Sequence, residues 1–187
     1  MKTTKTTKFN LILIAILLTT QTTFSQTYVG YSFNKYPVTE VYNGVKAKIN
    51  YKSNPTARGY RTMITQGYKN SKIDFAGHYT MTFWGAGTGM TVGAMVDNKT
   101  GNVYDLPLTE DNSYRGCYFT EKDSDNDNIF HNKNSKLFVT YTCTSERNET
   151  SKTELLTKKY SVFLWDEVKK RFILLKEKSE TKTQSIE

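Results

Sequence analysis

The segment from residue 75 to 107, FAGHYTMTFWGAGTGMTVGAMVDNKTGNVYDLP, constrains the fold of this chain more than any other part. Polar and apolar residues alternate in residues 75–84, and residues 90–97 are nearly all apolar or small. Short runs of this kind, bounded by glycines, are typical of β-strands. Gly101 suits the positive φ of a tight turn at 98–101, after which residues 102–106 pair back as a hairpin. The segment therefore predicts strand, glycine loop, strand, turn and strand.

The rest of the chain is predicted to be β as well. Its 13 Tyr and 10 Phe, with only 3 Pro, suit pleated and half-buried surfaces. Alternation and turn residues predict further strands at 44–52, 60–68, 114–120, 136–144, 160–165 and 171–176. Residues 54–59 are predicted as a turn, and residues 146–159 as a long loop or short helix. About eight to ten short strands favour an antiparallel β-sandwich, with a small propeller-like or barrel arrangement as the alternative.

The N-terminus has the pattern of a secretory signal peptide. Residues 1–8 carry three lysines and no acid, residues 9–18 are apolar apart from Asn10, and a polar stretch with small residues runs to Ser25. The apolar run is shorter than the roughly 20 residues of a membrane-spanning helix, although a retained N-terminal anchor is the alternative. We therefore predict a signal peptide at 1–25, a single β domain at 26–178 and a disordered polar tail at 179–187.

Charge and export together restrict the class of partner. The net charge of +8 falls to +5 when Lys2, Lys5 and Lys8 leave with the signal peptide. This excess favours weak attraction to acidic glycans, anionic surfaces or acidic proteins. The remaining lysines form no long basic block, which argues against nucleic-acid binding. We expect a secreted or periplasmic monomer without a cofactor or a stable membrane anchor, whose partner is an unknown protein or glycan of the envelope.

Cys117 and Cys143 are the only two cysteines of the chain. An exported protein with one pair of cysteines is expected to form one disulfide. On the chain-entropy model, a bridge across this loop stabilises the fold by roughly 3 kcal/mol. Two free buried thiols are the alternative.

The glycine loop is the predicted binding site. It consists of Trp84, Gly85, Ala86, Gly87, Thr88 and Gly89. A dinucleotide-binding site is rejected because a β segment follows the loop instead of a helix, and a P-loop because no GK[ST] closes it. The glycines either allow a tight bend between two strands or let a ligand approach closely, with Trp84, Gly85, Gly87, Thr88, Gly89 and nearby His78 as the contacts.

His78 is the one candidate catalytic residue. It would act as a general base together with Asp74, Asp97 or Asp105, but a hydrogen-bonded structural histidine is the competing interpretation. A metal site is not predicted, because His131 is the only other imidazole. An EF-hand at residues 123–134 is rejected, because Asn128 and Asn134 stand where that motif needs Gly and Glu.

One part of the chain resembles known proteins. The FAGHY run, the WGxGTG loop and the final D-x-K-T-G-x-V-Y-x-L-P are similar to a set of small exported bacterial β proteins of uncharacterised function. Those proteins read WGCGTGC in the loop, whereas this chain has Ala86 and Met90 at the two cysteine positions. The resemblance implies export and a mainly β domain, and it implies no catalytic residue.

Two classes of function follow as hypotheses. The first is an exported non-enzymatic binding or accessory protein of the cell envelope, for example an inhibitor or partner of an extracellular protein. The alternative is a hydrolase-type enzyme that uses His78 with an Asp, although no nucleophile motif such as GxSxG is present.

Overall fold

The fold is built from antiparallel strands. The computed structural model describes residues 27–87, 91–109, 112, 119 and 128–186. Within them, nine strands form three antiparallel sheets, accompanied by two short α-helices and one 3-10 turn, and no sheet closes into a barrel. The predicted all-β antiparallel fold is therefore confirmed. The strands are β1 Thr27–Tyr28, β2 Tyr31–Ser32, β3 Tyr79–Gly85, β4 Thr91–Asp97, β5 Val103–Asp105, β6 Ile129–His131, β7 Leu137–Asn148, β8 Thr153–Asp166 and β9 Arg171–Ser185.

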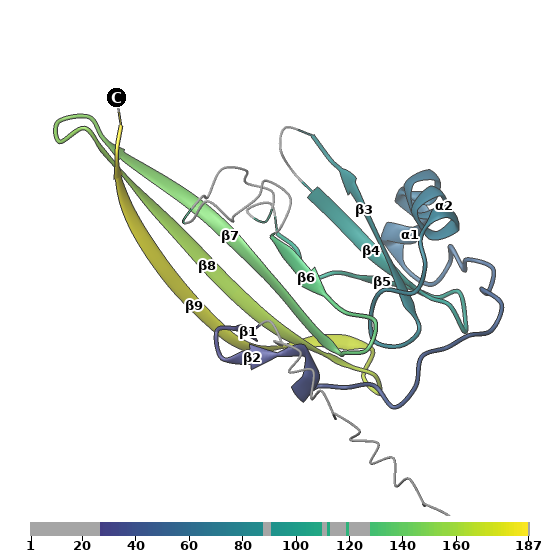
Figure 1. Cartoon of the computed structure of the whole chain (residues 1–187). Coiled ribbons are helices and arrows are strands. Elements are labelled where there is room, and N and C mark those ends of the chain that lie inside the picture. Colours follow the sequence, from purple (N-terminus) through teal and green to yellow (C-terminus); the bar gives the residue numbers. More distant parts are fainter. Residues whose placement is uncertain (1–26, 88–90, 110–111, 113–118, 120–127, 187) are drawn as a thin grey trace, which may run out of the picture.

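The two larger sheets form two layers. Figure 1 shows the sheet β3-β4-β5 beside the sheet β6-β7-β8-β9, with the helices on the far side of the three-stranded sheet. The β1-β2 hairpin contributes Tyr28 to a cluster with Leu137, Val139 and Val162 on the four-stranded sheet. Both faces of each sheet near the middle of the molecule therefore carry a covering element.

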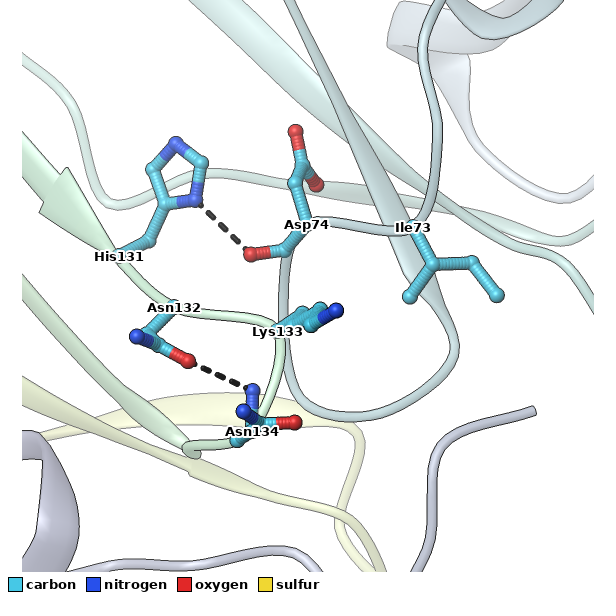
Figure 2. Close-up of a pocket in the computed structure, with 6 residues that line it drawn as sticks. All are labelled: Ile73, Asp74, His131, Asn132, Lys133 and Asn134. Atoms are coloured by element: carbon cyan, nitrogen blue, oxygen red, sulfur yellow. Dashed lines mark hydrogen bonds between the residues drawn. The ribbon is translucent and has the colours of Figure 1, made fainter. Parts of the chain in front are cut away.

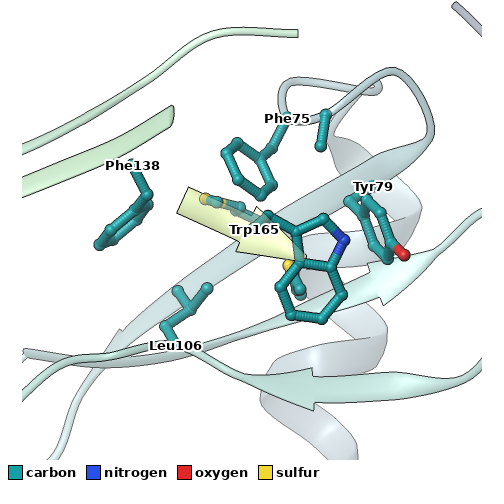
Figure 3. Close-up of a cluster of buried hydrophobic side chains, with 8 residues drawn as sticks. Phe75, Tyr79, Leu106, Phe138 and Trp165 are labelled. Carbon is teal, nitrogen blue, oxygen red and sulfur yellow. The ribbon is translucent and has the colours of Figure 1, made fainter. Parts of the chain in front are cut away.

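The layers meet in an aromatic core. Phe75, Tyr79 and Met81 from one side pack with Phe138 and Trp165 from the other (Figure 3). The Trp165 ring lies 5.3 Å from the Tyr79 ring and 5.0 Å from that of Phe172. Burying side chains of this size stabilises the fold by about 1.5–3 kcal/mol each, so this cluster holds the two sheets together.

The helices correct the sequence prediction. Residues 60–68, predicted as a strand, belong largely to α2 Arg61–Asn70, and most of the predicted turn at 54–59 is α1 Pro55–Gly59. Asn54 caps α1 by accepting a hydrogen bond from the Thr56 N–H at 2.6 Å. Ile64 and Tyr68 of α2 are buried against β3 and β4. Because a spacing of four residues keeps both side chains on one face of a helix and on one face of a strand, alternation alone misled the prediction.

Residues 44–52 are not a strand either. They lie alongside the β4-β5 turn in space. Ala47 N donates to Asn98 O at 3.0 Å, and Asn50 N donates to Gly101 O at 2.8 Å. Gly101 has a φ of 77°, as predicted, and a Cβ there would collide with the Lys48 carbonyl. The glycine therefore permits both the turn and the close passage of this segment.

The long strands β7, β8 and β9 extend beyond the three-stranded sheet as an arm (Figure 1). Residues 146–159, predicted as a loop or short helix, form the β7-β8 hairpin, and residues 179–185 of the predicted disordered tail pair with β8. In the arm, Glu154 accepts hydrogen bonds from Gln184 Nε2 at 2.8 Å and Arg147 Nε at 3.3 Å. Polar cross-strand pairs thus replace the apolar alternation on which the prediction depended.

Several predictions fall wholly or partly outside the described residues, among them the signal peptide at 1–25. The predicted strand at 114–120 lies there except for Phe119, and so does the acidic segment 123–127. Among the helices that the structure describes, none is long and apolar enough to cross a membrane.

Candidate functional site

A polar network joins the two sheets at the start of β3. We call it the Glu167 cluster: His78, Tyr79, Trp165, Glu167 and Lys170. The Glu167 carboxylate accepts hydrogen bonds from Trp165 Nε1 at 2.7 Å and from Tyr79 OH at 3.0 Å, and it forms an ion pair with Lys170. Lys170 Nζ also donates to Tyr79 OH at 3.0 Å. The β8-β9 turn, which carries Glu167 and Lys170, is thereby attached to β3.

Burial and charge shift the ionisation of this cluster. Burial lowers the pKa of His78 below its ordinary value, while the nearby carboxylates of Glu167 and Asp97 act against that shift. Burial also raises the pKa of Tyr79 far above its ordinary range. For Glu167, burial acts to raise the pKa, but hydrogen bonds from Lys170, Trp165 and Tyr79 outweigh it and the pKa is lowered. The cluster therefore favours an ionised Glu167 beside a neutral Tyr79.

His78 lies between two carboxylates without forming a catalytic pair with an aspartate. Its Nε2 is 3.3 Å from Glu167 Oε1 and 3.8 Å from Asp97 Oδ1. Asp97 already accepts from Lys99 N and Thr100 Oγ1, both at 2.8 Å, in the β4-β5 turn. Among the described residues, no hydroxyl or thiol hydrogen-bonds the His78 ring. This geometry supports the structural interpretation of His78, and within the described part of the chain it places no hydroxyl or thiol nucleophile on this ring.

The glycine loop is only partly described. Gly85 ends β3 opposite Thr91, and Gly87 has a φ of 119° with open space where a Cβ would stand. Thr88 and Gly89 lie outside the described residues, so a binding role for the loop stays a prediction.

Trp84, the aromatic residue predicted to contact a ligand, lies in the core instead. Its side chain is 7% exposed and packs under α2, with its ring 5.1 Å from that of Tyr60. Trp84 was predicted as a contact because it begins the glycine loop, and the sequence did not reveal that the helices cover this face of the sheet.

Figure 2 shows a second place where a histidine and an aspartate meet. His131 and Asp74 line a pocket of about 320 Å³ together with Ile73, Asn132, Lys133 and Asn134. His131 Nδ1 lies 3.1 Å from the Asp74 carbonyl oxygen, to which it donates, and Asp74 Oδ1 accepts from Met81 N at 2.9 Å. Burial raises the pKa of Asp74, against several weaker effects that lower it. Both residues thus hold the β6-β7 turn against the segment before β3.

No metal centre is apparent in the part of the chain that the structure describes. There, no three His, Cys, Asp or Glu side chains gather in a way that could hold a metal ion. His78 and His131 each have their own carboxylate neighbours, so the two imidazoles do not form a common site.

An open depression lies beside the Glu167 cluster. We call it the Arg171 depression, and its volume is about 330 Å³. It is lined by apolar and aromatic side chains with polar and charged residues among them: Asn54, Tyr104, Asp105, Leu106, Pro107, Trp165, Lys170, Arg171 and Phe172. These residues come from the cap of α1, from β5 with the segment after it, and from the β8-β9 hairpin. Because these residues are far apart in the sequence, no local sequence motif predicts this site.

Only one cysteine of the predicted disulfide lies in the described part of the chain. Cys143 is buried on β7, and the described part of the chain contains no free cysteine. Cys117 lies outside the described residues, so the Cys117–Cys143 pairing stays a prediction.

Comparison with known proteins adds no identity. The chain matches no protein-family model, no curated protein and no solved structure. The resemblance of residues 75–107 to a set of small exported proteins therefore also stays a prediction.

Proposed function

We propose that this chain is an exported, non-enzymatic binding protein of the cell envelope, and that it binds its protein or glycan ligand in the Arg171 depression. The observation that carries the proposal is the depression itself, an open hollow with aromatic lining and charged residues at one place on the surface. Its volume is at the lower end of the range for small-molecule pockets. A pocket of this size suits one or two residues of a protein or glycan chain.

The neighbouring chemistry supports binding over catalysis. The side chains of the Glu167 cluster that have acid–base character are already paired with one another. Such a saturated network stabilises the walls of a site and leaves no uncommitted base within the cluster itself. The aromatic rings of the lining are fixed by contacts with Trp165, which is 5.4 Å from Tyr104 in an edge contact and 5.0 Å from Phe172 in a tilted one. A site that is already ordered loses little entropy when a ligand binds.

The proposal is tested by retention of envelope material. The mature protein, residues 26–187, is immobilised and exposed to isolated envelope proteins and envelope polysaccharides in separate experiments. We expect the wild type to retain one of the two fractions and Arg171→Gln to retain much less of it. Lys176→Gln is the matched control, because this lysine is exposed on the same strand but does not line the depression.

Two results would count against the proposal. Retention of neither fraction by the wild type would contradict a binding function in the envelope. Equal retention by wild type and Arg171→Gln would show that the ligand binds elsewhere, for example at the glycine loop.

A further inference from the structure

We propose that the Arg171 depression recognises a saccharide unit that carries a single carboxylate, that is, a uronic acid residue of a polysaccharide. The inference rests on the proposed function and names its ligand class. Three kinds of group line the depression and carry the inference. They are aromatic rings, a cation without an ion pair, and two polar side chains, of which one is a hydrogen-bond donor and the other an acceptor.

The apolar part of the lining provides a stacking surface. Tyr104 and Phe172 are half-buried, so part of each ring borders the depression. Their positions are held by Trp165, which is itself almost completely buried. The Tyr104 ring also stands edge-on to Tyr79 at 6.0 Å. Rigid aromatic rings with one accessible part suit the apolar C–H face of a pyranose ring.

The cations of the depression differ in what they already bind. Lys170 is neutralised locally by its ion pair with Glu167. Arg171 is exposed, and among the described residues no carboxylate lies within 4 Å of its guanidinium. Its partner across the ladder is Asp166, whose Oδ1 accepts from Val168 N and Lys169 N at 3.0 Å. These hydrogen bonds lower the pKa of Asp166, and the charge of Arg171 adds a weaker effect in the same direction without a direct ion pair. An uncommitted guanidinium presents a fork of donors that matches one carboxylate.

The three-stranded sheet and the helix cap contribute the remaining polar groups. Asn54 uses its Oδ1 to cap α1, which leaves its amide nitrogen as a donor. Asp105 is exposed, and no described residue donates a hydrogen bond to its side chain. A carboxylate acceptor and an amide donor together suit ring hydroxyl groups.

The balance of charge selects a monoanion. With Lys170 paired, the uncommitted groups of the depression are one cation, Arg171, and one anion, Asp105. A second negative group on the ligand would meet Asp105, and like charges at close range disfavour binding. The depression therefore suits a ring with one carboxylate and several hydroxyls better than a polyphosphate or a heavily sulfated chain.

The test uses a trisaccharide that has one galacturonate unit and two neutral units, the methyl ester of that trisaccharide, and mature protein in isothermal titration calorimetry at low salt. We expect the wild type and Lys176→Gln to bind the acid at least tenfold more tightly than the ester. Arg171→Gln is expected to bind both with the affinity of the wild type for the ester. Asp105→Asn is expected to weaken this preference for the single acid by admitting a sulfated trisaccharide that the wild type rejects.

The outcomes separate the two proposals. Equal affinity for acid and ester, or no binding of the acid trisaccharide by a protein that retains envelope material, would overturn the uronate inference and leave the binding function standing. If the wild type binds neither the saccharides nor any envelope fraction, the proposed function itself is wrong. Near-native circular dichroism of Arg171→Gln would show that its loss of affinity is not due to unfolding.

Discussion

At the scale of single residues, Glu167 is the side chain on which the junction of the two sheets depends most. Its carboxylate satisfies the donors of Tyr79 and Trp165, whose side chains are almost completely buried. We expect Glu167→Ala to lower the free energy of unfolding by about 2 kcal/mol, because buried donors without partners are costly and water reaches only part of the space. Urea denaturation measures the change.

Two variants make this prediction specific. Glu167→Gln keeps one acceptor oxygen and is expected to recover part of the loss. Glu180→Ala, at an exposed carboxylate of the arm, is expected to leave the midpoint unchanged. If Glu167→Ala also unfolds at the wild-type midpoint, the cluster does not stabilise the junction.

His78 makes stability depend on pH in a defined direction. Burial lowers its pKa in the folded protein, so below the ordinary value of about 6.5 the unfolded chain binds a proton that the folded protein resists. The free energy of unfolding should therefore fall as the pH decreases from 7.5 to 5.5. Glu167, with its lowered pKa, adds to this loss only in more acidic solution.

Denaturation of His78→Gln in the same pH range tests this prediction. The variant is expected to lose less stability on acidification than the wild type, because the residue that resists protonation is absent. His131→Gln is the matched control, since it retains His78 and so retains this contribution. Parallel curves for wild type and His78→Gln would contradict the assignment.

At the scale of elements, the sequence predicted strands well where one face is apolar and a turn residue follows. β3, β4 and β5 were predicted in this way: alternation indicated β3, a nearly continuous apolar run indicated β4, and Gly101 indicated the turn of the β4-β5 hairpin. The same rule failed for α2, whose buried Ile64 and Tyr68 fit either period. It also failed for residues 44–52, where Val45 is 90% exposed and the segment is held by backbone hydrogen bonds to the β4-β5 turn together with polar side-chain contacts such as Asn50 Nδ2 to Asn102 Oδ1 at 3.0 Å.

The end of β9 offers a direct test at this scale. Residues 179–185 were predicted to be disordered, but they pair with β8 residues 153–159. We expect a chain that ends at Lys178 to melt several degrees below wild type, because it loses these ladder hydrogen bonds and exposes the edge of β8. Hydrogen exchange should show faster exchange at 153–159.

A shorter truncation provides the control. A chain that ends at Ser185 removes only the last two residues and keeps the whole β8-β9 ladder. It is expected to melt like the wild type. Identical melting of both truncated chains would support the disordered tail and contradict the paired strand.

At the scale of the whole molecule, the candidate site could not be predicted from the sequence. The Arg171 depression requires three segments to meet, and only the packing of the two sheets through Trp165 brings them together. The glycine loop and His78, in contrast, were predicted as site residues because closely spaced glycines and a rare histidine stand out in the sequence. One of these choices, Trp84, is a core residue, because the sequence does not reveal that helices cover that side of the sheet.

The predicted export and the predicted disulfide concern the whole chain and can be tested together. We expect the full-length chain, expressed in a bacterium with a secretory pathway, to accumulate outside the cytoplasm with Gln26 as its first residue.

Alkylation of the denatured, non-reduced protein should label neither Cys117 nor Cys143, and after reduction it should label both. The predicted bridge would close a loop whose entropy corresponds to about 3 kcal/mol, so Cys143→Ser is expected to be less stable than the wild type by a similar amount. Reduced wild type should show the same loss, which separates the effect of the bridge from that of the serine hydroxyl in the buried site of Cys143. Cytoplasmic protein that begins at Met1 would contradict export, whereas two labelled thiols in exported protein would contradict the bridge alone.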